Sequence, residues 1–98
     1  MNKLQMSILC SILKQYSELI QYAIELGKNA TSIQKEQLTT ILKDLNLSAN
    51  VLSTQIKQCA ISPEKCNAVI LYHCACLGRV KKQMKKVGEK FGNYQNSD

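Results

Sequence analysis

The sequence has no tryptophan, one proline, one phenylalanine and four glycines in 98 residues. All-β sandwiches and barrels need many turns built on proline and glycine, and strands rich in aromatic and β-branched residues, so this composition argues against them. Long apolar runs are also missing, and none approaches the about 20 residues that a membrane-spanning helix requires. What is present, 45% hydrophobic and 20% charged residues, is typical of a globular chain that folds as one domain.

A clear export signal is missing as well. The N-terminus resembles a lipoprotein leader in outline, but Gln5 interrupts the apolar stretch and Leu9, which is not a small residue, precedes Cys10. The chain has five cysteines, an odd number that fits a reducing compartment better than a disulfide framework. We therefore expect a cytoplasmic protein with free thiols. A bridge between Cys59 and Cys66 across the second turn is the alternative under oxidising conditions.

Apolar residues recur at steps of three and four along three stretches of the chain, as they do on one face of an α-helix. The first stretch covers residues 4–26. Gly27 followed by Lys28 predicts its end, with the glycine in a left-handed conformation and the lysine at the negative end of the helix dipole.

Capping signals predict where the other two helices begin. Thr31 is followed three residues later by Gln34, which is the spacing of a capping box. Ser62-Pro63-Glu64 offers a serine cap, a proline at the first helical position and an acid near the positive end of the dipole. We therefore expect a second helix from Thr31 or Ser32 and a third helix from Pro63.

The predicted connections have about four residues, which forces consecutive helices to run antiparallel. The sequence thus predicts an all-α, antiparallel three-helix bundle (up-down-up) of long amphipathic helices over residues 1–91. Residues 92–98 lack apolar periodicity and are expected to form a short disordered, flexible tail. So slender a bundle should leave apolar surface on residues 8–26, which a second copy or another protein would cover.

This remaining apolar surface supplies the predicted partner contacts. They lie on the apolar stripes of the first and third helices: Leu9, Ile12, Tyr16, Ile20, Ile24, Val80, Met84, Val87 and Phe91. We expect these side chains to pack against an apolar helix of a protein partner or against a second copy of the chain. The predicted function is accordingly a small non-enzymatic protein-binding module, such as a co-chaperone or adaptor.

One cluster of side chains has the chemistry of metal ligands: Cys66, His73, Cys74 and Cys76. Zinc binds thiolates and imidazoles, but Cys74 points about 100° away from His73 on a helix, so at most two or three of the four converge. We favour cysteines that pack as small hydrophobes and a neutral His73 that is hydrogen-bonded across the bundle. We assign no metal, no cofactor and no catalytic residue, because the single histidine has no evident orienting partner.

Positive charge gathers toward the C-terminal end of the chain. Residues 1–77 hold seven lysines and five acids, whereas residues 78–98 hold six basic residues and two acids. The six form a basic face on the side of the third helix away from its apolar stripe: Arg79, Lys81, Lys82, Lys85, Lys86 and Lys90. The alternative function is therefore a nucleic-acid-associated or regulatory protein that uses this face. Because this face has a single arginine and no interleaved aromatic residues, we expect it to attract phosphate groups without reading bases. Docking of the same face on a membrane is the least favoured interpretation.

The segment CNAVILYHCACL, residues 66–77, resembles the last helix of the small cytoplasmic E components of type III secretion needles. Those proteins end in a similar stretch rich in Ala and Ile that contains Tyr and His. They are short helical hairpins that hold the needle subunit before export together with a second chaperone. The resemblance implies a cytoplasmic helical co-chaperone. It assigns no functional residue, and the third helix and the cysteines depart from that family's pattern.

Overall fold

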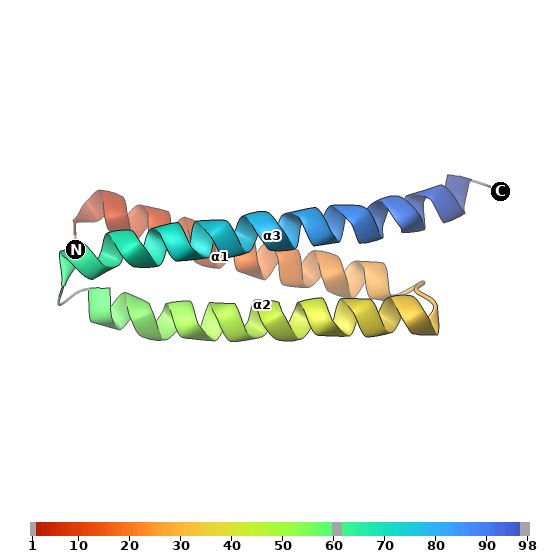
Figure 1. Ribbon diagram of the computed structural model, residues 1–98, viewed down its shortest axis with the longest axis horizontal. Helices are drawn as coiled ribbons and strands as arrows, with labels where there is room; N and C mark the ends of the chain where they lie inside the picture. The colour runs from red at the N-terminus through yellow and green to blue at the C-terminus, as the bar shows by residue number, and fades with distance from the viewer. Residues whose placement is uncertain (1, 60–61, 97–98) are drawn as a thin grey trace.

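The computed structural model describes the backbone of residues 2–59 and 62–96, and the side chains of these residues other than 59, 63 and 89–96. The chain forms three helices, α1 (Lys3–Gly27), α2 (Ser32–Cys59) and α3 (Pro63–Asn96). Each helix packs against the other two, and α2 runs antiparallel to both α1 and α3 (Figure 1). The predicted all-α, antiparallel three-helix bundle is confirmed, and no strand occurs in the part of the chain that the structure describes.

Local hydrogen bonds explain where the helices begin. Asn2 caps α1, because its Oδ1 accepts from the Gln5 amide at 2.8 Å while Gln5 Oε1 accepts from the Asn2 amide at 3.1 Å. The predicted capping box before α2 is confirmed: the Gln34 amide donates to Thr31 Oγ1 at 3.3 Å, and the Thr31 amide donates to Gln34 Oε1 at 2.9 Å. Pro63 opens α3 as expected. Such caps contribute about 1 kcal/mol each.

The end of α1 differs from the expectation. No glycine in the described residues has a positive φ, so Gly27 does not provide a left-handed cap. The chain instead continues through Lys28 in a right-handed conformation, with the Lys28 amide donating to the Glu25 carbonyl at 3.2 Å. The Lys28 ammonium also pairs with the Glu25 carboxylate at 2.9 Å. The last turn of α1 therefore closes at Lys28 in a right-handed conformation, which does not require the conformational freedom of glycine.

The C-terminal end of α3 extends past the end of α1 (Figure 1). Helical backbone continues to Asn96, across most of the segment for which the sequence predicts a flexible tail. Residues 97–98 lie outside the described residues, and the flexibility of residues 92–98 stays a prediction.

The core lies along the axis where the three helices meet. Every apolar stripe in the sequence contributes to it, and α1 contributes on two sides because it contacts both α2 and α3. The fully or almost fully buried members are Leu9, Ile12, Tyr16, Ala23, Leu38, Ile41, Leu45, Leu52, Cys66, Leu77, Met84 and Val87. The periodicity of the sequence therefore identified the faces that pack together.

Surface contacts also join the parallel helices α1 and α3. Lys81 Nζ donates to Gln15 Oε1 at 2.7 Å. Further along both helices, the Tyr22 hydroxyl lies close to Gly88. A Cβ atom added to Gly88 would lie only 2.9 Å from this hydroxyl oxygen. Gly88 thus leaves room for the Tyr22 side chain at this crossing, whereas a Cβ atom on Gly78 would meet nothing within 4 Å.

We predict that Gly78→Ala raises the free energy of unfolding by about 1 kcal/mol, because alanine is the better helix former and the site is open. Gly88→Ala should gain less, because the Tyr22 hydroxyl must move. Urea denaturation of both variants measures the difference. In a Tyr22→Phe background, Gly88→Ala should recover the gain seen at Gly78; equal gains at both glycines in the wild-type background would contradict the prediction.

Candidate functional site

Five of the nine residues predicted to contact a partner lie inside the chain's own core. Their side chains are between 0% and 9% exposed: Leu9, Ile12, Tyr16, Met84 and Val87. The expectation that these five side chains contact a partner is therefore wrong, because the other two helices of the bundle already cover them. A period of 3.6 residues identifies an apolar stripe, but it does not tell which stripe the chain covers by itself.

The other predicted contact residues are placed differently. Ile20 and Val80 are half-buried and pack against the core, and Ile24 is 45% exposed. The side chain of Phe91 lies outside the described residues. A partner contact therefore stays a prediction for these four positions.

Large apolar side chains do remain exposed, and two of the nine in the described residues, Leu47 and Tyr72, line a hollow between α2 and α3. Leu47 and Val51 stand one turn apart on α2 and are 65% and 38% exposed. Leu71 and Tyr72 on α3 are 72% and 57% exposed. Leu47 and Tyr72 line the same hollow, so the two helices present apolar surface at the same level of the bundle.

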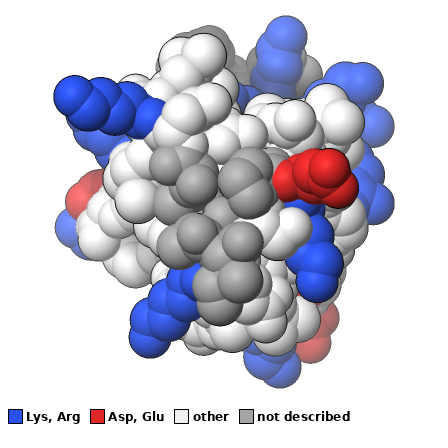
Figure 2. Space-filling view, turned by 90° about the vertical axis from the view of Figure 1, so that its left-hand side faces the viewer, with Lys and Arg blue, Asp and Glu red and all other residues white. Residues whose placement is uncertain are grey.

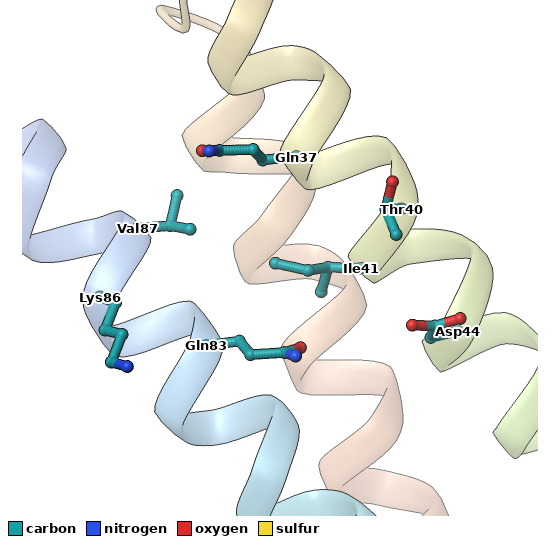
Figure 3. Close-up of a pocket in the computed structure, with 7 residues that line it drawn as sticks. All are labelled: Gln37, Thr40, Ile41, Asp44, Gln83, Lys86 and Val87. Atoms are coloured by element: carbon teal, nitrogen blue, oxygen red, sulfur yellow. The ribbon is translucent and has the colours of Figure 1, made fainter.

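Two adjoining hollows run between α2 and α3, and they share Asp44 and Gln83. The first has a volume of about 390 Å³ and is lined by Gln37, Thr40, Ile41, Asp44, Gln83, Lys86 and Val87 (Figure 3). The second has a volume of about 230 Å³ and is lined by Asp44, Leu47, Ser48, Tyr72, Cys76, Arg79, Val80 and Gln83. Together these lining residues define the α2–α3 groove.

The groove combines an apolar floor with polar walls. Figure 3 shows Ile41 and Val87 directed into the gap between the helices, while Asp44 lies on the α2 side and Lys86 on the α3 side. Ile41 and Val87 belong to the core, with 6% and 9% of their surface exposed. A ligand in this groove would therefore contact the edge of the core itself.

The basic residues of α3 are exposed but do not form one uniform face. Arg79 and Lys86 line the α2–α3 groove, whereas Lys81 lies on the side of α1 and donates to Gln15. Lys82 and Lys85 are exposed between these two flanks, and the side chain of Lys90 is outside the described residues. Viewed end-on, Lys and Arg project around much of the circumference (Figure 2). The groove therefore holds only part of the positive charge.

The cysteines do not assemble a metal centre in the described residues, where no three His, Cys, Asp or Glu side chains come together. Cys66 and Cys76 are buried, as expected for cysteines that pack as hydrophobes, but Cys74 and Cys10 are exposed. Arg79 Nη2 donates to Cys76 Sγ at 3.3 Å. The side chain of Cys59 lies outside the described residues, so its predicted alternative pairing is not described.

Among the described side chains, His73 is the one polar or charged residue that is buried, with 0% of its surface exposed. The Tyr16 hydroxyl of α1 lies 2.7 Å from Nδ1, and Gln55 Oε1 of α2 lies 2.7 Å from Nε2. The amide oxygen assigns the imidazole proton to Nε2, so Nδ1 accepts from Tyr16. The predicted neutral His73, hydrogen-bonded across the bundle, is confirmed, and it joins all three helices.

Burial favours the neutral forms of the two titratable side chains in this hydrogen-bonded network, His73 and Tyr16. Desolvation lowers the pKa of His73 below its ordinary value of 6.5. Desolvation, followed by the electrostatic effect of the neighbouring Cys76, raises the pKa of Tyr16 to about 12, and a hydrogen bond with Ser48 acts in the opposite direction. Both groups are therefore neutral at neutral pH.

Sequence reasoning missed the exposed apolar residues that border the groove. Leu47 follows the buried Leu45 by two positions and Tyr72 precedes the buried His73, so both fall off the apolar stripes. The only sign of such residues in the sequence is an apolar side chain at a position outside the apolar stripe of its helix. It does not say which helix lies beside it, and that information came only from the packing of α2 against α3.

Comparisons with known proteins leave the site without a relative. No family model, no curated protein and no solved structure matches this chain. Within the described residues, no helix has the length and apolar character needed to span a membrane.

We predict that the free energy of unfolding falls when the pH is lowered through about 6.5, the ordinary histidine pKa. The unfolded chain binds the proton first, because burial lowers the pKa of His73 in the folded state. The loss continues until the pH passes below the folded pKa. Urea titrations at several pH values between 5 and 8 test this. His73 is the only histidine, so His73→Gln should remove the dependence in that range, and its persistence would contradict the assignment.

We further predict that Tyr16→Phe lowers the free energy of unfolding by about 1–3 kcal/mol, because it leaves the buried Nδ1 of His73 without a donor. Tyr22→Phe is the matched control on the same helix, since Tyr22 is 47% exposed and its loss should cost about 0.5 kcal/mol or less. Thermal or urea unfolding measures both. Equal losses for the two variants would show that the hydrogen bond to His73 contributes nothing specific.

Proposed function

We propose that this chain is a non-enzymatic helical protein-binding module of the cytoplasm, an adaptor or co-chaperone that covers an apolar helix of a partner or associates with itself. One observation carries the proposal. The three helices complete a core, yet Leu47 and Tyr72, which line the α2–α3 groove, stay 65% and 57% exposed. Burying such side chains contributes about 1–3 kcal/mol each, so a partner that covered them would gain substantial binding energy.

The occupied nitrogens of His73 support a non-enzymatic role. One ring nitrogen is bonded to Tyr16 and the other to Gln55, and the ring is buried. A general base needs a free nitrogen within reach of a substrate proton. The one histidine of the chain is thus engaged in joining helices.

The resemblance of residues 66–77 to the E components of type III secretion needles supports the same direction. This segment forms the N-terminal part of α3 and contains Leu71 and Tyr72, both exposed. A co-chaperone needs apolar helical surface with which to hold its client. The resemblance thus favours a co-chaperone over other kinds of adaptor.

The second candidate function, a nucleic-acid-associated protein, is favoured by five exposed basic side chains on α3: Arg79, Lys81, Lys82, Lys85 and Lys86. A salt titration separates the two functions. Neutralising phosphates makes affinity fall steeply with ionic strength, whereas a mainly apolar helix interface depends only weakly on salt.

The test of the proposed function is capture from a native lysate followed by mass measurement of the intact assembly. Wild-type chain should retain a protein in fixed stoichiometry, or a second copy of itself. Leu47→Asp should abolish that assembly, while Ile33→Asp should preserve it. The two positions form a matched pair on α2, because Leu47 and Ile33 are 65% and 71% exposed and only Leu47 lines the α2–α3 groove.

A wild-type chain that stays monomeric and retains no protein in fixed stoichiometry would overturn the proposed function. Retention of nucleic acid that disappears at raised ionic strength would instead establish the second candidate. An assembly that survives Leu47→Asp would show that the contact does not involve the groove side of α2.

A further inference from the structure

We propose that the α2–α3 groove binds one acidic amphipathic helix of a different protein. The apolar side chains of that helix would pack at Leu47 and Tyr72, and its carboxylates would pair with Arg79 and Lys86. The inference rests on the proposed function and specifies its site and its partner class.

The apolar end of the groove is held in place before any partner arrives. Tyr72 contacts the His73 ring edge-on, with ring centroids 5.1 Å apart and an interplanar angle of 89°. His73 is itself held by Tyr16 and Gln55 at 2.7 Å each. An exposed tyrosine packed on a fixed ring loses little conformational freedom on binding, which favours its use as an anchor. Leu47 lines the same hollow from the opposite helix.

Two basic side chains also line the groove, Arg79 in the same hollow as Tyr72 and Lys86 in the adjoining one. Arg79 and Lys86 follow Tyr72 by seven and fourteen residues, which corresponds to about two and four helical turns, or roughly 10 and 21 Å along α3. Asp44 is the one carboxylate among the residues that line the two hollows. Among the described residues, neither Arg79 nor Lys86 forms an ion pair with a carboxylate of the chain. Their charges are therefore available to a partner.

These positions define the partner. A helix that lies along the groove and places an apolar anchor at Tyr72 would need acidic residues about seven and fourteen positions away from that anchor. It would need about four turns, or roughly 15 to 18 residues, to cover the distance from Tyr72 to Val87. Helix-in-groove recognition by an apolar stripe with flanking charges is a common mode of binding between proteins.

A second copy of this chain fits the groove less well. The chain has a net charge of +6, and a two-fold dimer would bring the same patch of both copies together. Arg79 and Lys86 would then face a surface whose one lining carboxylate is Asp44. Like charges across an interface oppose association. Charge complementarity thus favours an acidic partner, and self-association becomes an outcome of the test.

The test uses the full chain and three fluorescein-labelled probes. The acidic probe is an 18-residue amphipathic peptide with a leucine stripe flanked by glutamates. The basic probe keeps the leucine stripe and replaces each glutamate by lysine. An 18-nucleotide single strand represents nucleic acid. Fluorescence anisotropy should show saturable one-to-one binding of the acidic peptide and at least about tenfold weaker binding of the basic peptide, a difference of about 1.4 kcal/mol.

Two matched pairs of variants locate the binding. Leu47→Asp should weaken binding of the acidic peptide by about tenfold, and Ile33→Asp should leave it unchanged. The double variant Arg79→Glu/Lys86→Glu should weaken it by at least about tenfold, while Lys81→Glu/Lys85→Glu, with the same change in net charge on the same helix, should change it by less than about threefold. Thermal unfolding confirms that each variant is folded.

Charge reversal supplies the decisive arm. Arg79→Glu/Lys86→Glu should bind the basic peptide better than the wild type does, which a misfolded variant could not do. The proposal is overturned if both peptides bind wild type equally, if the two charge-reversed pairs weaken binding equally, or if Leu47→Asp has no effect. Tighter binding of the single strand, or a dimer that excludes the peptide, would also overturn it.

The two proposals fail separately. Suppose that the chain captures a stoichiometric partner, that Leu47→Asp abolishes this capture, and that the acidic peptide is not preferred. This result would overturn the acidic-helix proposal and leave the protein-binding function standing. A chain that forms no assembly with any protein in the lysate overturns the function, whatever the peptides do.

Discussion

The hydrogen bonds of His73 constrain the rest of this structure, because they join one side chain from each helix inside the core. Tyr16 of α1 and Gln55 of α2 occupy the two nitrogens of a ring on α3, at 2.7 Å each. Leucine and isoleucine contacts tolerate sliding by a turn, since one apolar residue replaces another. A buried polar group does not, because moving it away from its partners leaves donors and acceptors unpaired. No buried side-chain nitrogen or oxygen in the described residues lacks a partner.

The register set in the core also determines the surface. Tyr72 adjoins His73 and rests edge-on against its ring, so fixing the ring places an aromatic side chain at the apolar end of the α2–α3 groove. Arg79 and Lys86 follow on the same side of α3 at helical spacing and place positive charge along the groove. The proposed recognition surface is thus a consequence of how α3 is held against α1 and α2. A small bundle can present a preformed groove only if its helices cannot slide.

Several features of the fold could be predicted from the sequence because they depend on neighbours along the chain. The capping box of Thr31 and Gln34, the start of α3 at Pro63 and the stripes that pack together all appear at the expected places. The end of α1 was predicted at the right residue for the wrong reason. Gly27 does not adopt a left-handed conformation, and the last turn closes with the Lys28 amide donating to the Glu25 carbonyl. Several local mechanisms can stop a helix at one position, and the sequence does not tell them apart.

The candidate site was harder to predict, because exposure depends on residues far apart in sequence. Leu9, Ile12 and Met84 looked available for a partner but are covered by the other helices, whereas Leu47 and Tyr72 lie off the stripes and remain exposed. The sequence by itself determined the three helices, their directions and the residues able to form a core, since helical period and capping are local. Only the tertiary structure decided which apolar side chains stay in water, and that Tyr16, Gln55 and His73 meet. Those outcomes depend on side-chain contacts between residues that are 18 and 57 positions apart in the sequence.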